Sequence, residues 1–409
     1  MTEIRPFAGI RYRVEPSRLS EVLAPPYDVI TAKDRQALAA RHPKNAVRLV
    51  LAESAEEAAY ARVGEILKAW REEKVLVDDR EPALYLLEQS FEVMGETRVR
   101  RGLLARFRAE DPERRVVLPH EQTRKAPRED RLRMLRATRV NFSPIFIMVR
   151  DAQGRLERRA EEIAKAEPEV SFTDDGGVGH RMWVVTDAAA VSELQGALGA
   201  AAAYIADGHH RYATALRFRD ETGPDGAWTL GYFTALESPG LVVLPYHRIL
   251  SAGPSLEQAA EKLAPAFDVT RLDDPGEAAR AAARSDRRYA FGLAQPGAGA
   301  LVAESKQAIL GMLAADAPPS LRALDPWVFH TLVLEQLLGI GPEAVDYVHS
   351  LAEAEEAVAS GGCRLAGLLR PTPVQQIVDV AEAGESMPAK STFFHPKLPS
   401  GLVIHPLLV

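Results

Sequence analysis

The segment of the chain with the clearest chemistry is 203–216, Ala-Tyr-Ile-Ala-Asp-Gly-His-His-Arg-Tyr-Ala-Thr-Ala-Leu. It predicts a buried strand, a tight turn at Gly208 and a helix that begins at about His209, with Asp207 as the helix N-cap. Free backbone N–H groups, the positive end of a helix dipole, two imidazoles and a guanidinium would then meet at one point. These groups are what an anion site needs, and phosphate is its most natural ligand.

The same segment has two other interpretations. His209 and His210 could simply pack at a strand–helix turn, in which Ala213 and Leu216 are expected to face inward. As a metal pair the two histidines are weaker candidates, because adjacent side chains at a helix start diverge. The phosphate interpretation predicts these ligands: Gly208, His209, His210 and Arg211.

A second candidate is the basic segment 114–139, which has nine Arg or Lys residues against three acidic ones. Such a local excess in a chain of net negative charge could bind a polyanion, and Lys125 is a candidate phosphate ligand. Glu121 stands beside the cluster and could act as a general base or a magnesium ligand. Taken individually, the arginines of the later part are expected on a solvated helix face: Arg131, Arg133, Arg136 and Arg139.

Polar residues in three further segments are candidate ligand contacts. Asp28 lies in a proline-stiffened loop, where it could touch a ligand or cap the following helix. Asn141 and Ser143 are candidate substrate contacts, although such positions often belong to turns and edges. The segment 387–397 lacks the glycines of a P-loop and fits either a loop that closes over a ligand or a plain C-terminal strand. Its candidate phosphate ligands are Lys390, Ser391 and Thr392.

Composition sets the class of protein. The chain has 409 residues, of which 46% are apolar and 26% charged, as in ordinary soluble globular proteins of two or three domains. Its net charge of −7 disfavours a nucleic-acid partner. A single cysteine excludes a disulfide framework and favours the cytoplasm. No apolar run of bilayer length and no secretory leader is visible, so we expect no membrane partner. The oligomeric state stays open.

The secondary-structure pattern predicts a mixed α/β fold in which strands and helices alternate. We expect a core domain at 1–250 and a smaller α/β domain at 251–409, whose last segment, 387–409, returns to the core. In the first domain the pattern predicts a helix at 54–74, hairpins at 83–108 and 228–244, and strands at 143–149, 182–185 and 203–206. In the second it predicts helices at 256–263, 276–284, 351–359 and 374–383 and strands at 267–272, 289–294 and 364–369.

Several motifs together resemble a known family. They are Leu-Ala-Pro-Pro-Tyr-Asp-Val-Ile at 23–30, His-Glu-x-Thr at 120–123, Asn-x-Ser-Pro-Ile-Phe at 141–146, the segment 205–216, and Lys-Ser-Thr-x-Phe-x-Pro-Lys-Leu at 390–398. This set resembles the conserved prokaryotic family called domain of unknown function ten-fifteen, from one end of the chain to the other.

Locally, the Asp-Gly-His-His-Arg turn is similar to the phosphate-binding turn of the ParB and sulfiredoxin fold group, which includes a free-serine kinase. The resemblance implies a ParB/sulfiredoxin-like core, with a nucleotide's phosphates on Gly208, His209, His210 and Arg211. A sulfiredoxin activity is not implied, because histidine stands where that chemistry needs cysteine.

The serine-kinase member makes the leading hypothesis a nucleotide-dependent phosphotransferase that acts on a small hydroxyl-bearing metabolite. Mg²⁺ with ATP or ADP would then be the cofactor, Asp207 a metal ligand and catalytic carboxylate, and Glu121 the base. Two other functions stay open. A phosphatase or nucleotide hydrolase would use the same anion site with water as acceptor, and a ParB-like regulator would sense nucleotide without catalysis.

Overall fold

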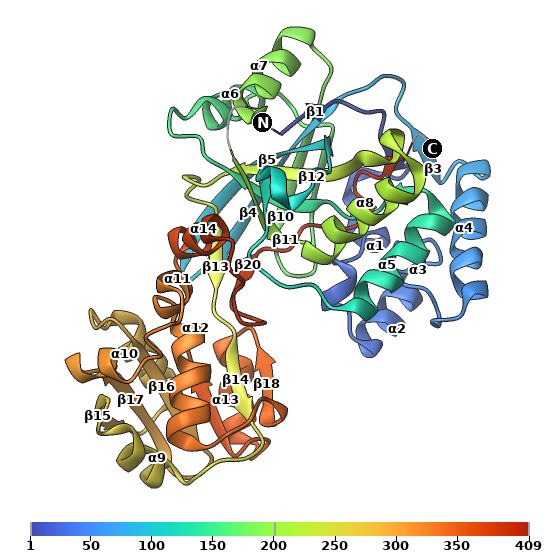
Figure 1. Cartoon of the computed structure of the whole chain (residues 1–409). Helices are drawn as coiled ribbons and strands as arrows, with labels where there is room; N and C mark the ends of the chain where they lie inside the picture. Colours follow the sequence, from blue (N-terminus) through green and yellow to red (C-terminus); the bar gives the residue numbers. More distant parts are fainter. Residues whose placement is uncertain (1, 200–201, 408–409) are drawn as a thin grey trace. The chain divides into compact units, whose positions relative to one another are not determined.

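The computed structural model describes residues 2–199 and 202–407 as a mixed α/β chain, which confirms the fold class expected from the sequence. The chain divides into two compact units, each with a sheet and helices of its own (Figure 1). Unit 1 comprises Met1–Pro119, Thr123–Val242 and Pro396–Val409, and unit 2 comprises His120–Gln122 and Val243–His395. The domain limits expected from the sequence, 1–250 and 251–409, stay predictions.

Unit 1 is built on a nine-stranded mixed sheet. Its strands follow the order β6-β11-β8-β12-β5-β4-β10-β9, and β1 pairs with β5 outside this path. The strands are β1 Ile4–Arg5, β4 Leu84–Val93, β5 Glu96–Arg108, β6 Val117–Leu118, β8 Ile145–Val149, β9 Val170–Thr173, β10 Gly179–Val185, β11 Ala203–Asp207 and β12 Trp228–Ala235. Short strand pairs β2 Ile10–Tyr12 with β3 Leu76–Asp78, and β7 Val140–Asn141 with β21 His405–Pro406, lie outside the sheet.

The helices of unit 1 connect these strands. They are α1 Leu19–Val22, α2 Ala32–Arg41, α3 Val47–Val50, α4 Glu57–Glu72, α5 Lys125–Thr138, α6 Arg155–Ile163, α7 Ala188–Gly199 and α8 His209–Thr222. α8 follows β11 through Gly208 alone, so one residue separates the strand from the helix. The buried residues of α8 include Tyr212 and Ala215, whereas Ala213 and Leu216, expected to face inward, are half-buried.

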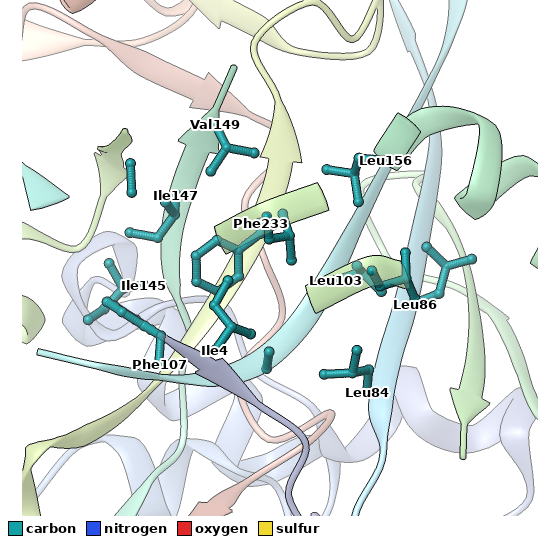
Figure 2. Close-up of a cluster of buried hydrophobic side chains, with 14 of the residues drawn as sticks. Ile4, Leu84, Leu86, Leu103, Phe107, Ile145, Ile147, Val149, Leu156 and Phe233 are labelled. Carbon is teal, nitrogen blue, oxygen red and sulfur yellow. The ribbon is translucent and has the colours of Figure 1, made fainter. Parts of the chain in front are cut away.

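One face of the unit 1 sheet holds its apolar core (Figure 2). Alternate residues of a strand point to the same face, and Leu84 and Leu86 of β4 lie there beside Leu103 and Phe107 of β5. Phe233 of β12 joins the same cluster. The strand β11, which leads into the turn at Gly208, therefore lies in a packed sheet, and the sheet supports the turn rigidly.

The hairpin expected at 83–108 is confirmed, whereas the one expected at 228–244 is wrong. β4 and β5 pair antiparallel from Tyr85 opposite Leu104 to Val93 opposite Glu96. β12 instead lies between β5, to which it is antiparallel, and β8, to which it is parallel. Its neighbours in the sheet come from far earlier in the chain, so the turn residues 238–240 do not fold it back on the next strand.

Unit 2 contains an antiparallel six-stranded sheet of the order β15-β17-β16-β19-β14-β18. The strands are β14 His247–Leu250, β15 Phe267–Leu272, β16 Ala290–Gln295, β17 Gly299–Ser305, β18 Val345–Val348 and β19 Leu365–Leu368. The short strands β13 Val242–Leu244 and β20 Phe393–His395 form a separate pair. The helices are α9 Leu256–Leu263, α10 Pro275–Arg284, α11 Pro319–Arg322, α12 Asp325–Val328, α13 Leu351–Ala359 and α14 Val374–Ala383, with a π-helix at Phe329–Leu338.

The local sequence patterns predicted most other elements of both units. The helix expected at 54–74 forms as α4, and those expected at 256–263 and 351–359 form over the expected residues as α9 and α13. Within residues 2–199 and 202–407, none of the helices combines the length and the apolar character needed to cross a bilayer.

Candidate phosphate and substrate site

The strand, turn and helix expected at 203–216 form as β11, Gly208 and α8. Gly208 is the N-cap residue of α8, has φ +96°, and the helix starts without a side-chain cap. A Cβ atom on residue 208 would lie 2.9 Å from both Cζ and Nε of Arg211. Two features therefore require glycine at position 208: the backbone conformation and the close approach of the Arg211 side chain. The result is an uncapped helix start with a guanidinium against it.

Asp207 lies between two cations instead of capping the helix. Its Oδ2 atom is 3.2 Å from Nη2 of Arg211 and 3.5 Å from Nζ of Lys397. Burial raises the pKa of this carboxyl, but Lys397 and Arg211 together outweigh burial and hold the pKa well below its usual range. The expectation that Asp207 caps α8 is wrong, because its carboxylate is committed to these ion pairs.

Lys397 is the residue of this site that the sequence analysis did not single out. It belongs to the C-terminal segment of unit 1, and its carbonyl oxygen accepts a hydrogen bond from Nε2 of Gln89 at 3.2 Å. The preceding carbonyl, of Pro396, accepts from Nη2 of the fully buried Arg100 at 2.6 Å. These two bonds hold the backbone that carries Lys397. The motif at 390–398 contained the signal, but the residues chosen from it were the earlier ones.

The two histidines of the turn have different surroundings. His209 is buried, whereas His210 is half-buried and its Nε2 atom accepts the backbone N–H of Arg124 at 3.0 Å. Burial, reinforced by Arg124, lowers the pKa of His210, so the ring is neutral at pH 7. A neutral ring that accepts at Nε2 carries its proton on Nδ1. Since Arg124 is the N-cap residue of α5, His210 joins the start of α8 to the start of α5.

Arg211 also lines a cavity of about 60 Å³ inside unit 1. Its walls combine apolar side chains with a small number of polar ones. The residues that line it are Tyr27, Val50, Arg131, Met134, Leu135, Val140, Asn141, Phe142, Ser143, Arg211, Thr214 and Thr229. Two guanidinium groups therefore line one small space next to the predicted phosphate turn.

The second of these groups corrects the sequence interpretation of α5. Arg131 was expected on a solvated helix face, but it is buried with a relative exposure of 9%. Its Nη1 donates to the carbonyl of Val50 at 2.7 Å, its Nε donates to Asp130 at 2.7 Å, and its Cζ lies 4.0 Å from the ring centre of Tyr27. These contacts hold Arg131 in a buried position, although the sequence pattern of the helix does not distinguish it from the exposed Arg136 and Arg139.

Asn141 and Ser143, the predicted substrate contacts, line the cavity and are also bonded to the protein. Oδ1 of Asn141 accepts from the backbone N–H of Leu230 at 3.1 Å and lies 3.0 Å from Nδ1 of His405. Oγ of Ser143 lies 2.6 Å from Oγ of Ser400. Both side chains therefore shape the cavity wall, and their role toward a substrate stays a prediction.

Asp28 and Lys125, the other predicted ligands of unit 1, are exposed. Asp28 lies in a short 3₁₀ helix, Tyr27–Val29, and does not cap the following α2. That helix starts at Thr31, whose side chain accepts from the backbone of Asp34 in a capping box. The capping alternative for Asp28 is therefore wrong. Lys125 is the first residue of α5.

The remaining predicted residues gather in unit 2. Glu121 forms an isolated bridge with Met387, and Nε2 of the neighbouring His120 lies 3.5 Å from Oγ1 of Thr392. Oγ of Ser391 donates to the carbonyl of Pro388 at 2.6 Å. Lys390 places its ammonium 5.1 Å from the ring centre of Tyr246. Unit 2 thus brings Glu121 together with the start of the 390–398 motif.

Metal binding to protein ligands alone is not supported by any cluster among the described residues. No group of three or more His, Cys, Asp or Glu side chains in that part of the chain could hold an ion. Mg²⁺, however, is commonly held by one or two carboxylates together with substrate phosphates. Asp207 supplies one carboxylate at the turn, where it is paired with two cations, and its role as a ligand of such an ion stays a prediction.

The fold and the site together define a mixed α/β protein with a glycine-initiated, cation-flanked helix start. The family model described as "Protein of unknown function (DUF1015)" matches residues 4–327, and the chain belongs to this family. A search of the curated proteins found no match.

Three solved structures illustrate what the fold is similar to. A mutant free serine kinase in complex with AMP matches at 15% identity, over 70% of this chain and 89% of the other, with a TM-score of 0.35. A mutant free serine kinase in complex with ADP matches at 14% identity with the same coverage and a TM-score of 0.35. SbnI with a C-terminal truncation, from Staphylococcus aureus, matches at 11% identity over 71% and 84% of the chains, with a TM-score of 0.34. TM-scores of this size are too low to carry a function from those proteins to this chain.

Proposed function

We propose that this protein is a nucleotide-dependent phosphotransferase that acts on a small hydroxyl-bearing metabolite and binds the nucleotide's phosphates at Gly208. The observation that carries the proposal is the pairing of two cations with Asp207 at a helix start that has no side-chain cap. Arg211 and Lys397 share the single carboxylate of Asp207, and Arg211 lies against Gly208. The first N–H groups of α8 and these two cations are groups that bind phosphate oxygens.

In this proposal the turn neutralises the charge of the transferred phosphoryl group. The terminal phosphoryl group passes from ATP or ADP to the acceptor hydroxyl, and the shortened nucleotide leaves. Backbone N–H groups of α8, Arg211 and Lys397 bind the phosphate oxygens, and their preorganised charges stabilise the transition state. Asp207, kept ionised by the same cations, would hold Mg²⁺, which when bound adds positive charge at the phosphates.

The proton of the acceptor hydroxyl needs a base, and Glu121 stays a prediction from the sequence for this role, because it belongs to unit 2 and the turn belongs to unit 1. A carboxylate in this role accepts the proton as the new oxygen–phosphorus bond forms. Exchanging it for the isosteric amide, Glu121→Gln, should abolish turnover and spare nucleotide binding. Full turnover by Glu121→Gln would remove Glu121 from this role without touching the phosphate turn.

A direct test combines nucleotide binding with product analysis. Wild type and Arg211→Ala are titrated with ATP and ADP in the presence of Mg²⁺, and Arg217→Ala serves as the matched control because Arg217 is an exposed arginine of the same helix. Loss of charged hydrogen bonds worth about 1.5–3 kcal/mol should weaken binding by Arg211→Ala roughly tenfold to a hundredfold, with no change in the control. Equal affinity of Arg211→Ala and wild type would contradict the proposal.

Phosphorus NMR of the wild type with a mixture of small hydroxyl compounds then identifies the reaction. A new phosphate-ester signal that depends on both nucleotide and acceptor is the expected result. Release of inorganic phosphate without any acceptor would identify a hydrolase instead, and binding without turnover would identify a sensor.

A further inference from the structure

The charged residues that line the cavity are Arg211 and Arg131. Arg131 is balanced by Asp130, with its Nε 2.7 Å from Oδ2 of that residue. Arg211 and Lys397 share Asp207. Neither carboxylate lines the cavity, so the described residues of its lining present two guanidinium groups and no negative group. An oxyanion in the cavity would face both of them.

Arg211 has one donor that the protein does not use. Its Nη1 donates to the carbonyl of Pro144, and its Nη2 donates to Asp207 at 3.2 Å. Its Nε is buried and, within residues 2–199 and 202–407, meets no hydrogen-bond acceptor. A buried charged donor without an acceptor is unfavourable, and this one lies on the side of Gly208, where a Cβ atom would be 2.9 Å away. The guanidinium of Arg211 therefore lies between the turn and the cavity that it lines.

The chemistry of the walls excludes a cationic substituent on such a ligand. Of the described residues that line the cavity, none is Asp or Glu. The neutral polar groups Tyr27, Asn141, Ser143 and Thr214 can exchange hydrogen bonds with hydroxyl groups. An ammonium group in this space would face two guanidinium groups and find no carboxylate. The walls therefore favour a hydroxy acid over an amino acid.

The size of the cavity limits the ligand to a few heavy atoms. One water molecule needs about 10–15 Å³ of such volume. The cavity volume of about 60 Å³ therefore corresponds to roughly four to six water-sized positions, which suits a carboxylate with a short polar chain.

We propose that the cavity is the acceptor site, and that its ligand is a small hydroxy acid which carries one carboxylate and no ammonium group. This inference rests on the proposed phosphotransferase function and names its substrate class. The carboxylate lies against the guanidinium groups of Arg211 and Arg131, and the hydroxyl groups bind to the neutral polar residues of the wall. Because the same guanidinium lies against Gly208, an acid held by Arg211 lies one side chain away from the predicted phosphate turn.

Three ligands that share a hydroxymethyl group test the class directly. Glycerate has the carboxylate and a second hydroxyl, serine replaces that hydroxyl by an ammonium group, and glycerol lacks the carboxylate. Each is titrated calorimetrically into the full chain without nucleotide. We expect glycerate to bind at least about tenfold more tightly than either serine or glycerol, the ratio that one unsatisfied charged contact commonly produces. Serine or glycerol binding as tightly as glycerate would overturn the assignment.

Two variants locate the binding. Arg131→Met removes one guanidinium, and Arg133→Met is its control on the same helix, with a side chain that is 41% exposed and outside the cavity. Val50→Leu adds a methylene group to the apolar wall and fills the space without altering a charge, so it tests the site even if Arg131→Met is unstable. Both Arg131→Met and Val50→Leu should lower glycerate affinity about tenfold or more, and Arg133→Met should leave it unchanged. Unchanged glycerate affinity in folded Val50→Leu would overturn the proposal.

The same samples are then titrated with ATP and ADP in the presence of Mg²⁺, which separates the two proposals. Nucleotide binding without glycerate binding would overturn the hydroxy-acid site alone. Glycerate binding without any nucleotide binding would keep the hydroxy-acid site and overturn the phosphotransferase.

Discussion

Gly208→Ala is the most informative single substitution, because the structure assigns it two separable effects. Gly208 has φ +96°, a backbone conformation that a Cβ atom disfavours. The added methyl group would also lie 2.9 Å from Cζ and Nε of Arg211. The first effect is local strain, and the second displaces the arginine on which both the predicted phosphate turn and the proposed acid site depend.

The magnitude follows from adding the two effects. A left-handed backbone conformation costs a non-glycine residue about 1–2 kcal/mol. Moving the guanidinium disrupts its bonds to Asp207 and to the carbonyl of Pro144, and hydrogen bonds of charged groups are worth about 1.5–3 kcal/mol. We therefore expect Gly208→Ala to lower the stability of unit 1 by about 2.5–5 kcal/mol.

Gly177 supplies the matched control for backbone strain. It also lies in unit 1, has φ +77°, and a Cβ there would meet nothing within 4 Å. Gly177→Ala should therefore cost only about 1–2 kcal/mol. The measurement is urea unfolding followed by tryptophan fluorescence in a Trp327→Phe background, because the other three tryptophans, Trp70, Trp183 and Trp228, lie in unit 1.

A double-mutant cycle isolates the steric clash between the added methyl group and the guanidinium of Arg211. In an Arg211→Ala background the added methyl group has no guanidinium to displace, so Gly208→Ala should cost about as much as Gly177→Ala does. The difference between the two backgrounds is expected to be about 2 kcal/mol. Equal costs in both backgrounds, or a Gly208→Ala cost no larger than that of Gly177→Ala, would refute the contact between Arg211 and the turn.

Two further predictions use the same unfolding measurement. The folded-state pKa of Asp207 lies below its unfolded value, so its ion pairs stabilise the fold above about pH 4 and are lost as the pH falls through the folded pKa. Lys397→Met removes one cation and raises the pKa of Asp207, so the stabilisation by the ion pairs should be lost at higher pH than in wild type. Urea midpoints measured from pH 3 to 7 check this. The control Lys390→Met should behave as wild type. Phe233→Ala should lower the stability of unit 1 by about 3–5 kcal/mol, because its ring is fully buried in the sheet core, whereas Met94→Ala at an exposed hairpin tip should change it by less than about 0.5 kcal/mol.

Local periodicity explains why most elements could be predicted from the sequence and why one pairing could not. A short helix such as α9 has a serine cap and apolar residues at helical spacing, so its limits at Leu256 and Leu263 are encoded within a few residues. The partner of a strand has no such local code. β12 pairs with β5 and β8, which end at Arg108 and Val149. The residues between 228 and 244 do not indicate which strands β12 will pair with.

The candidate site shows the same division between local and long-range information. The turn at Gly208 was predicted because its residues are consecutive and each has a known conformational preference. Arg131 was assigned to solvent because a polar residue on a helix gives no sign of whether an aromatic ring and a carbonyl elsewhere will cover it. The contacts that bury it come from Tyr27 and Val50, more than 80 residues earlier.

The 390–398 motif shows why a continuous motif need not correspond to one continuous site. Its first part belongs to unit 2, where Lys390 lies over Tyr246, and its last part belongs to unit 1, where Lys397 pairs with Asp207. The two lysines therefore have different electrostatic partners although only six residues lie between them. Pooling them as one phosphate-binding loop would assign to Lys390 a charge interaction that belongs to Lys397. Each motif residue has to be assigned from its own contacts, and by that criterion Lys397 joins Arg211 as an ion-pair partner of Asp207 at the predicted phosphate turn.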